Sequence, residues 1–299
     1  MTLNDFYRIV EIRTKIISVS AFLIGTLFAA YHAGEISPLI VLLMLGATLS
    51  VDMGTTGFNS YFDFKSGVDN ARYNKECDKV LVHRGVGPDT ALLISLGLFA
   101  AAGVLGLSLG YLVGWEIILV GAACMAVGFL YNAGPYPLSN TPLGELFAGG
   151  FLGFVLVALS YYVQTQSLDP AALLLGLPSL LLVASILTVN NTCDIEGDRA
   201  AGRHTLSILL GPVRAELIVY SLGAAGYAAA LLVVLRYLPS ASVLPLLAAA
   251  TASAAEYRRM HARGYSHETK GASMQSISRV FMLYTLAMIV ALILGLTIG

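Results

Sequence analysis

The chain has 299 residues, of which 57% are hydrophobic and only 12% are charged, and its mean hydropathy is +0.78. These values lie well outside the averages for soluble domains and indicate an integral membrane protein. The net charge of −1 gives no support for nucleic-acid binding, which would need a basic patch or stripe. The three cysteines, Cys77, Cys124 and Cys193, have no framework spacing, which predicts free thiols rather than disulfides or a zinc site.

Nine apolar stretches are interpreted as membrane-spanning helices, which need about 20 residues each. They lie near residues 15–33, 38–62, 89–112, 115–132, 145–163, 171–193, 214–237, 242–257 and 277–298. The eighth is short and rich in Ala, and only a turn separates the third from the fourth. Acids and bases are mixed before the first stretch, unlike a cleavable signal, so we expect that span to be retained. The pattern predicts an all-α membrane protein with a single domain over residues 1–299.

The basic residues predict how these spans are oriented. If the N-terminus is cytoplasmic, every one of the 17 Lys and Arg residues except Arg236 falls in a segment on the cytoplasmic side. Cytoplasmic loops of membrane proteins carry such an excess of positive charge. We therefore predict a multi-pass protein of the inner or plasma membrane whose N-terminus is cytoplasmic.

The first of two acidic stretches ends the second predicted span. Asn59 and Asp63 stand four residues apart, so they share one face of a helix. Asp69 follows six residues later. Gly67 allows the helix to end, so that the carboxylate of Asp69 turns back towards Asp63.

The second acidic stretch ends the sixth predicted span. Asn190, Asp194 and Asp198 are again four residues apart, and they form one polar stripe if the helix continues through them. An even number of spans separates the two stretches, so both emerge on the same membrane face, predicted to be cytoplasmic, and can share one cavity. Mg²⁺ takes carboxylate oxygens and completes its shell with water and phosphate, and Mn²⁺ suits the same ligands.

Basic residues near both stretches are candidates to bind phosphate. Positive-inside topology alone accounts for most of those between residues 64 and 89. At least one or two should nevertheless face the site, because a diphosphate and four carboxylates outweigh the charge of two divalent ions. The residues selected as diphosphate ligands are Arg72, Lys79, Arg203 and Asn190.

Residues 129–146 connect the fourth and fifth predicted spans. This connection lacks Lys and Arg and is rich in Pro, Gly and Tyr, which predicts a structured re-entrant or capping loop. Tyr131 and Tyr136 are candidates to stack on an aromatic acceptor or an allylic cation, the alternative being interfacial belt residues. Glu145 follows Pro142 in a first helical turn, where the helix dipole alone favours a carboxylate. A role in the acceptor site and a structural role therefore stay equally open for Glu145.

Each of these aspartates, taken alone, also fits a solvated residue at a helix end. Two sets with one spacing on one membrane face favour a metal and phosphate site instead. An ion-coupled transporter would carry its carboxylates at broken helices near the membrane midplane. Here the acids cluster at span ends and alternate with Arg, which favours an enzyme acting on a phosphate ester.

These motifs resemble those of the UbiA-type intramembrane aromatic prenyltransferases. The match lies in Asn59-x3-Asp63-x5-Asp69 and Asp194-x3-Asp198, and the nine-span layout agrees over essentially the whole chain. Within that family, the segments NSYFDFKSGVDN, YNAGPYPLSNTPLGEL and NNTCDIEGDRAAGRHTLSILLG are most similar to the 1,4-dihydroxy-2-naphthoate polyprenyltransferases of menaquinone synthesis.

The resemblance implies nine helices around a central cavity with a cytoplasmic cap. Mg²⁺ would be held by Asn59 and by the four aspartates, which would also be the catalytic residues: Asp63, Asp69, Asp194 and Asp198. A polyprenyl diphosphate would bind these ions with its tail directed towards the lipid bilayer, and its ionisation would give an allylic cation. The ring of an aromatic acid would attack that cation and lose its carboxylate as CO₂, giving demethylmenaquinone and diphosphate.

Two departures from the family pattern leave the acceptor open. Relatives often carry a Lys shortly after the Gly-Pro of the fourth connection, where this chain has Leu138 and Ser139, and an Arg where it has Cys193. The alternative acceptors are 4-hydroxybenzoate and homogentisate. The sequence after Asp69 lacks the Asn-Arg-Pro typical of the 4-hydroxybenzoate branch, which argues against that acid. Prenyl chain length and oligomeric state are not specified by the sequence.

Overall fold

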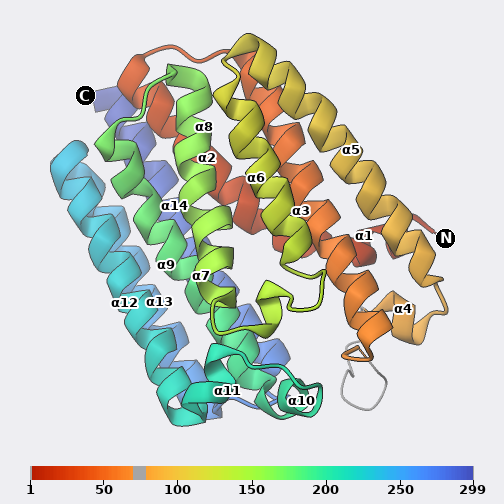
Figure 1. The fold of residues 1–299 in the computed structure, drawn as a ribbon. Coiled ribbons are helices and arrows are strands. Elements are labelled where there is room, and N and C mark those ends of the chain that lie inside the picture. Colours follow the sequence, from red (N-terminus) through yellow and green to blue (C-terminus); the bar gives the residue numbers. More distant parts are fainter. Residues whose placement is uncertain (1, 70–78, 299) are drawn as a thin grey trace.

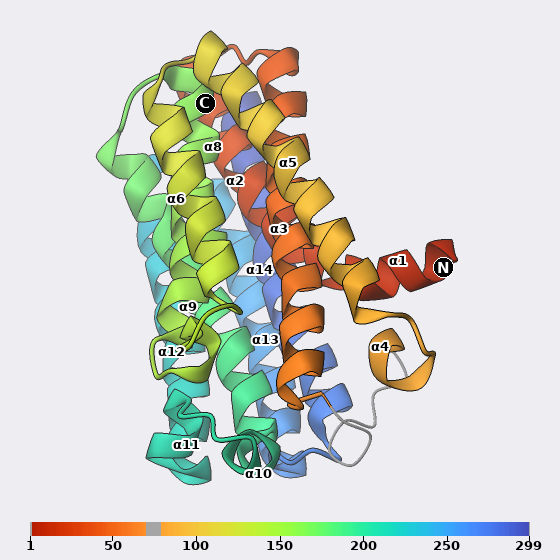
Figure 2. The ribbon, with the colours of Figure 1, turned by 45° about the vertical axis from the view of Figure 1, so that its right-hand side comes forward.

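The computed structural model describes residues 2–69 and 79–298 of the chain. Every regular element within these residues is helical, which confirms the prediction of an all-α protein. The long helices run side by side as one bundle, and α10 and α11 lie at one of its ends (Figure 1). The short helix α1 (Leu3–Ile9) instead lies across the bundle axis (Figure 2).

Within the described residues, one helix follows another along the chain and no strand is present. In the first half they are η1 (Ile12–Lys15), α2 (Ile16–Ala33), α3 (Pro38–Ser66), α4 (Val80–His83), α5 (Pro88–Leu112), α6 (Glu116–Leu130) and η2 (Leu138–Asn140). In the second half they are α7 (Gly144–Ala148), η3 (Gly149–Val155), α8 (Leu156–Thr165), α9 (Pro170–Cys193), α10 (Ile195–Ala200), α11 (Leu206–Leu210), α12 (Pro212–Tyr237), η4 (Ser240–Ser242), α13 (Val243–Arg263) and α14 (Lys270–Ile298).

Local sequence signals explain where several of these helices begin. Proline is the first residue of α3, α5, α9 and α12, where its missing N–H would have no helical acceptor in any case. Immediately before α9, the carboxylate of Asp169 accepts a hydrogen bond from the N–H of Ala171 at 2.7 Å. The apolar runs thus start as helices at positions that the sequence marks.

Helix α9 is the centre of the bundle. In its most apolar window 67% of the residues are buried, the largest share of any candidate span. It packs against α2, α8, α12 and α14, and against the π-helical segment η3. Gly149 and Gly153 of η3 permit this last approach, because a Cβ atom on either would collide with the backbone of Leu180 in α9.

Seven helical segments of the described chain are long and apolar enough to cross a membrane. They correspond to seven of the nine predicted spans and make this a multi-pass membrane protein. The other two predicted spans coincide with α6 and α13. Helix α6 is apolar but has only 15 residues, and α13 ends in a charged turn, so neither satisfies the same criterion. The count of nine spans stays a prediction, as does the side of the membrane on which each end lies.

The C-terminal ends of α3 and α9 lie at the same end of the bundle (Figure 1). Both predicted acidic stretches are therefore at one end, as the even number of intervening spans required. The short helices α10 and α11 and the connection from α6 to α7 lie at this end as well. They close the bundle around the polar site described next.

Candidate functional site

A single cavity of about 1970 Å³ connects the two acidic stretches with the apolar interior of the bundle. Its polar end is lined by residues from both stretches: Asn59, Asp63, Asp69, Asn190, Asp194 and Asp198. Its apolar walls come from α3, α5, α6 and η3, with side chains such as Leu107, Met125 and Phe151. The cavity therefore offers a polar site for a charged group and an apolar space for a hydrocarbon chain.

The end of α3 positions the first acidic stretch. Asn59 and Asp63 lie on one face of the helix, where the side-chain amide of Asn59 donates to Asp63 Oδ2 at 2.9 Å. Gly67 ends the helix in the left-handed conformation, with φ of 77°. The backbone N–H of Asp69 then bonds to the carbonyl of Asp63 at 3.0 Å, which confirms that the chain turns back towards Asp63.

The second stretch is not one continuous helix. Helix α9 ends at Cys193, Asp194 lies between the helices, and α10 begins at Ile195. The backbone N–H of Asp198 still bonds to the carbonyl of Asp194, at 2.8 Å. This helical spacing keeps Asp194 and Asp198 on the same cavity although the helix is interrupted between Asn190 and Asp198.

Each of the four aspartates is paired with a basic side chain. Arg203 forms a fork between the two stretches, with Nη2 at 2.8 Å from Asp63 Oδ1 and Nη1 at 3.1 Å from Asp198 Oδ1. Lys270, the first residue of α14, lies 2.8 Å from Asp194 Oδ2. Lys79 lies 3.3 Å from Asp69 Oδ2.

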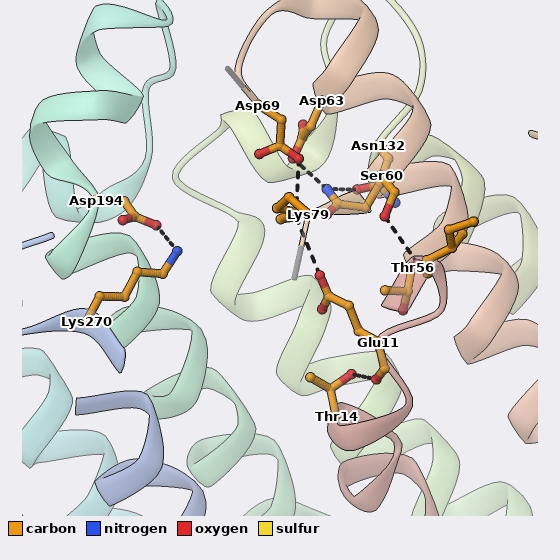
Figure 3. A network of polar contacts seen from close by, with 12 residues as sticks. Glu11, Thr14, Thr56, Ser60, Asp63, Asp69, Lys79, Asn132, Asp194 and Lys270 are labelled. Carbon is orange, nitrogen blue, oxygen red and sulfur yellow. Dashed lines mark hydrogen bonds and ion pairs between the residues drawn. The ribbon is translucent and has the colours of Figure 1, made fainter. Parts of the chain in front are cut away.

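The two acidic stretches face each other across the cavity. Figure 3 shows Asp194 and Lys270 on one side, and Asp63, Asp69 and Lys79 on the other. Lys79 also contacts Glu11, at 3.5 Å. Glu11 is one of two non-glycine residues with positive φ in the described chain, and such strain is concentrated at functional sites. Lys79 thus contacts both Asp69 and Glu11, and a phosphate group bound in the cavity would compete with these two carboxylates for it.

The donor set fits a hard divalent cation. It consists of carboxylate and amide oxygens, which are the ligands of Mg²⁺. Asp198 Oδ2 is buried and has no hydrogen-bond partner, and Arg203 Nε is in the same state. Burial raises the pKa of Asp198 to about 6, although neighbouring Arg203 opposes this rise. An ion taken up here would satisfy the orphaned oxygen and favour the ionised carboxylate.

Ligation by several aspartates at once would require side chains to move. Within residues 2–69 and 79–298, no three His, Cys, Asp or Glu side chains already lie close enough to hold one ion. Arg203, Lys79 and Lys270 are already paired with oxygens of these carboxylates. A divalent ion would take their place on the aspartates and leave these cations to bind the phosphate groups.

The remaining predicted site residues have different locations. Asn190 and Tyr131 line the cavity, and the Tyr131 hydroxyl lies 3.4 Å from the carbonyl oxygen of Gly144. Tyr136 is 87% exposed and does not line the cavity, so nothing in its location supports contact with the acceptor. Glu145 is buried behind the wall, where its Oε1 accepts a hydrogen bond from Asn191 at 2.8 Å. Arg72 lies outside the described residues.

Several residues at the site were not selected from the sequence, among them Lys270 and Asn132. Lys270 was counted only for topology, because it is 72 residues beyond Asp198 in sequence and belongs to no motif. Asn132 lies in the loop after α6, buried, with its side-chain oxygen 3.1 Å from Asn59 Nδ2. The only sequence signal for Asn132 is that an amide lies in a loop otherwise rich in Gly, Pro and Tyr.

Comparison with known proteins identifies the family of this architecture. The model of the UbiA prenyltransferase family matches residues 18–282. A 1,4-dihydroxy-2-naphthoate octaprenyltransferase of Bacillus subtilis is 37% identical over 189 residues, which are 63% of this chain and 60% of the relative. The UbiA prenyltransferase domain-containing protein 1 of Mus musculus is 31% identical over 198 residues, or 65% of this chain and 58% of that protein. These matches thus span about 60% of each relative's length.

Solved structures agree in fold over nearly the whole chain. A UbiA homologue from Archaeoglobus fulgidus, bound to DMAPP and Mg²⁺, superposes with a TM-score of 0.69 at 15% identity. The superposition covers 94% of this chain and 99% of that one. A UbiA homologue from Aeropyrum pernix K1 gives a TM-score of 0.67 at 19% identity, covering 96% and 98% of the two chains. At such identities the likeness shows the fold alone.

Proposed function

The chain belongs to the UbiA prenyltransferase family, and we propose that it transfers a polyprenyl group from polyprenyl diphosphate to 1,4-dihydroxy-2-naphthoate. The carboxylate of the acceptor leaves as CO₂, so the other products are diphosphate and the hydroquinone form of demethylmenaquinone (demethylmenaquinol), which becomes the quinone only on later oxidation. The observation that carries the proposal is the meeting of two acidic stretches at one cavity, where Arg203 joins Asp63 to Asp198. The apolar walls of the same cavity suit the hydrocarbon chain of the donor.

The aspartates and Asn59 are the residues that would hold Mg²⁺. When bound, the ion neutralises the charge that develops on the departing diphosphate, and Mn²⁺ can supply the same chemistry. Arg203, Lys79 and Lys270 then donate hydrogen bonds to phosphate oxygens, and Asn190, which lines the same cavity, contacts the same group. Because the three residues come from separate parts of the fold, they would hold the diphosphate from several sides.

The apolar part of the cavity protects the reacting carbon. Water must be excluded there, because water would capture an allylic cation in a side reaction. Tyr131 lines the cavity, where its ring can stabilise positive charge.

The bond changes balance without an external base. The carbon–oxygen bond of the donor breaks, and both electrons leave with the diphosphate. The acceptor ring supplies an electron pair for the new carbon–carbon bond at the carbon that carries the carboxylate. The bond to that carboxylate then breaks, its electron pair returns to the ring, and CO₂ departs. No ring proton has to be removed from this acceptor.

The choice of acceptor rests on the relatives. The proteins of Bacillus subtilis and of Mycobacterium tuberculosis, the latter 30% identical over 181 residues, are both named 1,4-dihydroxy-2-naphthoate octaprenyltransferases. The alternative is another aromatic acid, either 4-hydroxybenzoate or homogentisate.

A transporter is disfavoured because the carboxylates lie at one end of the bundle. We further propose nine spans in the inner or plasma membrane, with the N-terminus and the site cytoplasmic.

The proposal is tested by turnover of the purified protein in lipid. A polyprenyl diphosphate and Mg²⁺ are supplied with 1,4-dihydroxy-2-naphthoate or 4-hydroxybenzoate, and products are identified by mass, with EDTA as the control. We expect a prenylated 1,4-dihydroxynaphthalene that has lost the carboxylate and that does not form with EDTA. Product from 4-hydroxybenzoate alone would overturn the acceptor and retain the chemistry. Turnover that persists in EDTA would overturn the metal assignment.

A further inference from the structure

Asn132 is buried beside Asn59 at the cavity wall, in the connection from α6 to α7. The α6 end fixes its backbone, since its N–H bonds to the carbonyl of Phe129 at 3.1 Å. Its side chain is only 6% exposed and touches α3 at two points. Its Oδ1 accepts from Asn59 Nδ2 at 3.1 Å, and its Nδ2 donates to the backbone carbonyl of Thr55 at 3.0 Å.

These bonds fix the direction of the Asn132 amide. A flip would place its NH₂ group against the NH₂ group of Asn59, and its oxygen against the carbonyl oxygen of Thr55. Both hydrogen bonds would become repulsive contacts between like groups. The Thr55 carbonyl therefore determines that Asn132 presents an acceptor to Asn59.

The same reasoning fixes the Asn59 amide. Its NH₂ group has two hydrogens, one bonded to Asp63 Oδ2 at 2.9 Å and the other to Asn132 Oδ1. With both donors used, the carbonyl oxygen of Asn59 is the atom left for a ligand, and within the described chain no donor is hydrogen-bonded to it. Asn59 lines the cavity, so this oxygen is available to a cation there.

Asp63 alone would hold this orientation poorly. Its carboxylate also pairs with Arg203, and the proposed chemistry requires it to turn towards a metal ion. Both polar atoms of the Asn132 side chain are bonded to α3, which suits this residue to hold Asn59. It can hold Asn59 in place while Asp63 exchanges partners.

We propose that Asn132 is a positioning residue that orients Asn59 Oδ1 towards a divalent cation in the cavity. This inference rests on the metal site of the proposed function and adds a residue outside both aspartate motifs. The same loop also reaches the second stretch, where the Asn140 carbonyl accepts the N–H of His204, next to Arg203, at 2.8 Å. The connection from α6 to α7 thus contacts both sides of the site.

The test measures binding of Mn²⁺ rather than turnover. Free Mn²⁺ is followed by electron paramagnetic resonance as it is titrated into the purified protein with inorganic diphosphate present. The variants are Asn132→Ala, Asn59→Ala and the double variant. The matched control is Asn140→Ala, which removes an amide from the same loop and leaves its backbone hydrogen bond in place. Asn132→Ser replaces the alanine variant if that variant is not folded.

We expect Asn132→Ala to weaken Mn²⁺ binding roughly 10- to 100-fold, which is typical for partners that orient a ligand. The control should bind as the wild type does. In the Asn59→Ala background, Asn132→Ala should have no further effect, because its influence passes through Asn59. Unchanged affinity in Asn132→Ala, or an equal loss in both backgrounds, would overturn the inference.

The outcomes separate this inference from the proposed function. Wild-type protein that binds Mn²⁺ but makes no prenylated product from 1,4-dihydroxy-2-naphthoate would refute the proposed acceptor. The Mn²⁺ titrations of the Asn132 variants would still decide the role of Asn132. Wild-type affinity in Asn132→Ala would refute the positioning role and leave the function intact. Wild-type protein that takes up no Mn²⁺ with diphosphate would overturn both the metal site and the inference.

Discussion

Arg203 and Asp63 are 140 residues apart in the chain, and the guanidinium Nη2 of one lies 2.8 Å from the carboxylate Oδ1 of the other. The second arm of the same guanidinium reaches Asp198 at 3.1 Å. A planar fork of this kind can hold two carboxylates at a fixed separation, which a lysine ammonium cannot do as well. The contact defines the distance between the two acidic stretches, and with it the site where a diphosphate would bind.

Asp63→Asn and Asp194→Asn should each abolish turnover while the protein stays folded. An amide keeps the shape of the side chain but loses the negative charge that a divalent cation requires. The measurement is product formation by each purified variant, with helical content and thermal unfolding checked against the wild type. Near-normal activity in either folded variant would refute the assignment of these aspartates as metal ligands.

Arg203→Met should raise the KM for polyprenyl diphosphate roughly 10- to 100-fold, because hydrogen bonds to charged groups contribute about 1.5–3 kcal/mol. Arg203→Lys should recover only part of the loss, since one ammonium cannot reproduce both arms of the fork. Steady-state kinetics with the acceptor saturating gives the comparison. The control is Arg199→Met, which removes an exposed arginine from α10 four residues earlier. A similar loss in the control would mean that general positive charge is responsible rather than the fork.

Lys15 and Asp52 form another buried ion pair along the cavity, at 2.6 Å. Ser18 donates to the other carboxylate oxygen and Lys15 also donates to Thr56, both at 2.6 Å. Asp52→Ala should lower the free energy of unfolding by about 3–5 kcal/mol, because it leaves a buried ammonium unpaired. The double variant Lys15→Met/Asp52→Leu should be far closer to the wild type. Unfolding in detergent measures both, and equal losses would contradict this explanation.

Glu145→Gln should leave the KM for the acceptor unchanged, since the side chain lies behind the cavity wall. A glutamine oxygen can still accept the hydrogen bond of Asn191. Glu145→Ala should instead reduce stability by about 1–3 kcal/mol, the cost of leaving a buried amide without its partner. Kinetics with varied acceptor and thermal unfolding of both variants distinguish these effects. A selective rise in acceptor KM for the glutamine variant would restore the role in the acceptor site.

Arg236→Glu should have little effect on turnover. Arg236 lies in the last turn of α12, and the rise of 1.5 Å per residue places it about 36 Å along the helix from Pro212, which is near the site end. Product formation with naphthoate acceptor is the measurement. A strong loss in folded protein would contradict the arrangement in which this arginine faces the opposite side of the membrane.

The sequence by itself determined the helical class and both motifs, and it also specified the face on which Asn59 and Asp63 lie. These properties are local. Apolar runs of sufficient length become helices in lipid because only helices or closed barrels satisfy every backbone group there. Four-residue spacing puts side chains on one face, and Gly67 ends the helix so that Asp69 turns back.

Only the tertiary structure decided which residues complete the site. Lys270, Asn132 and Glu11 come from three separate parts of the chain, and no sequence spacing links them to the aspartates. The same structure separated Tyr131, which lines the cavity, from Tyr136, which is exposed, and placed Glu145 behind the wall. The reason is physical: contacts between distant segments depend on how helices pack around α9, and packing is set by side-chain shape and by close approaches such as those of Gly149 and Gly153.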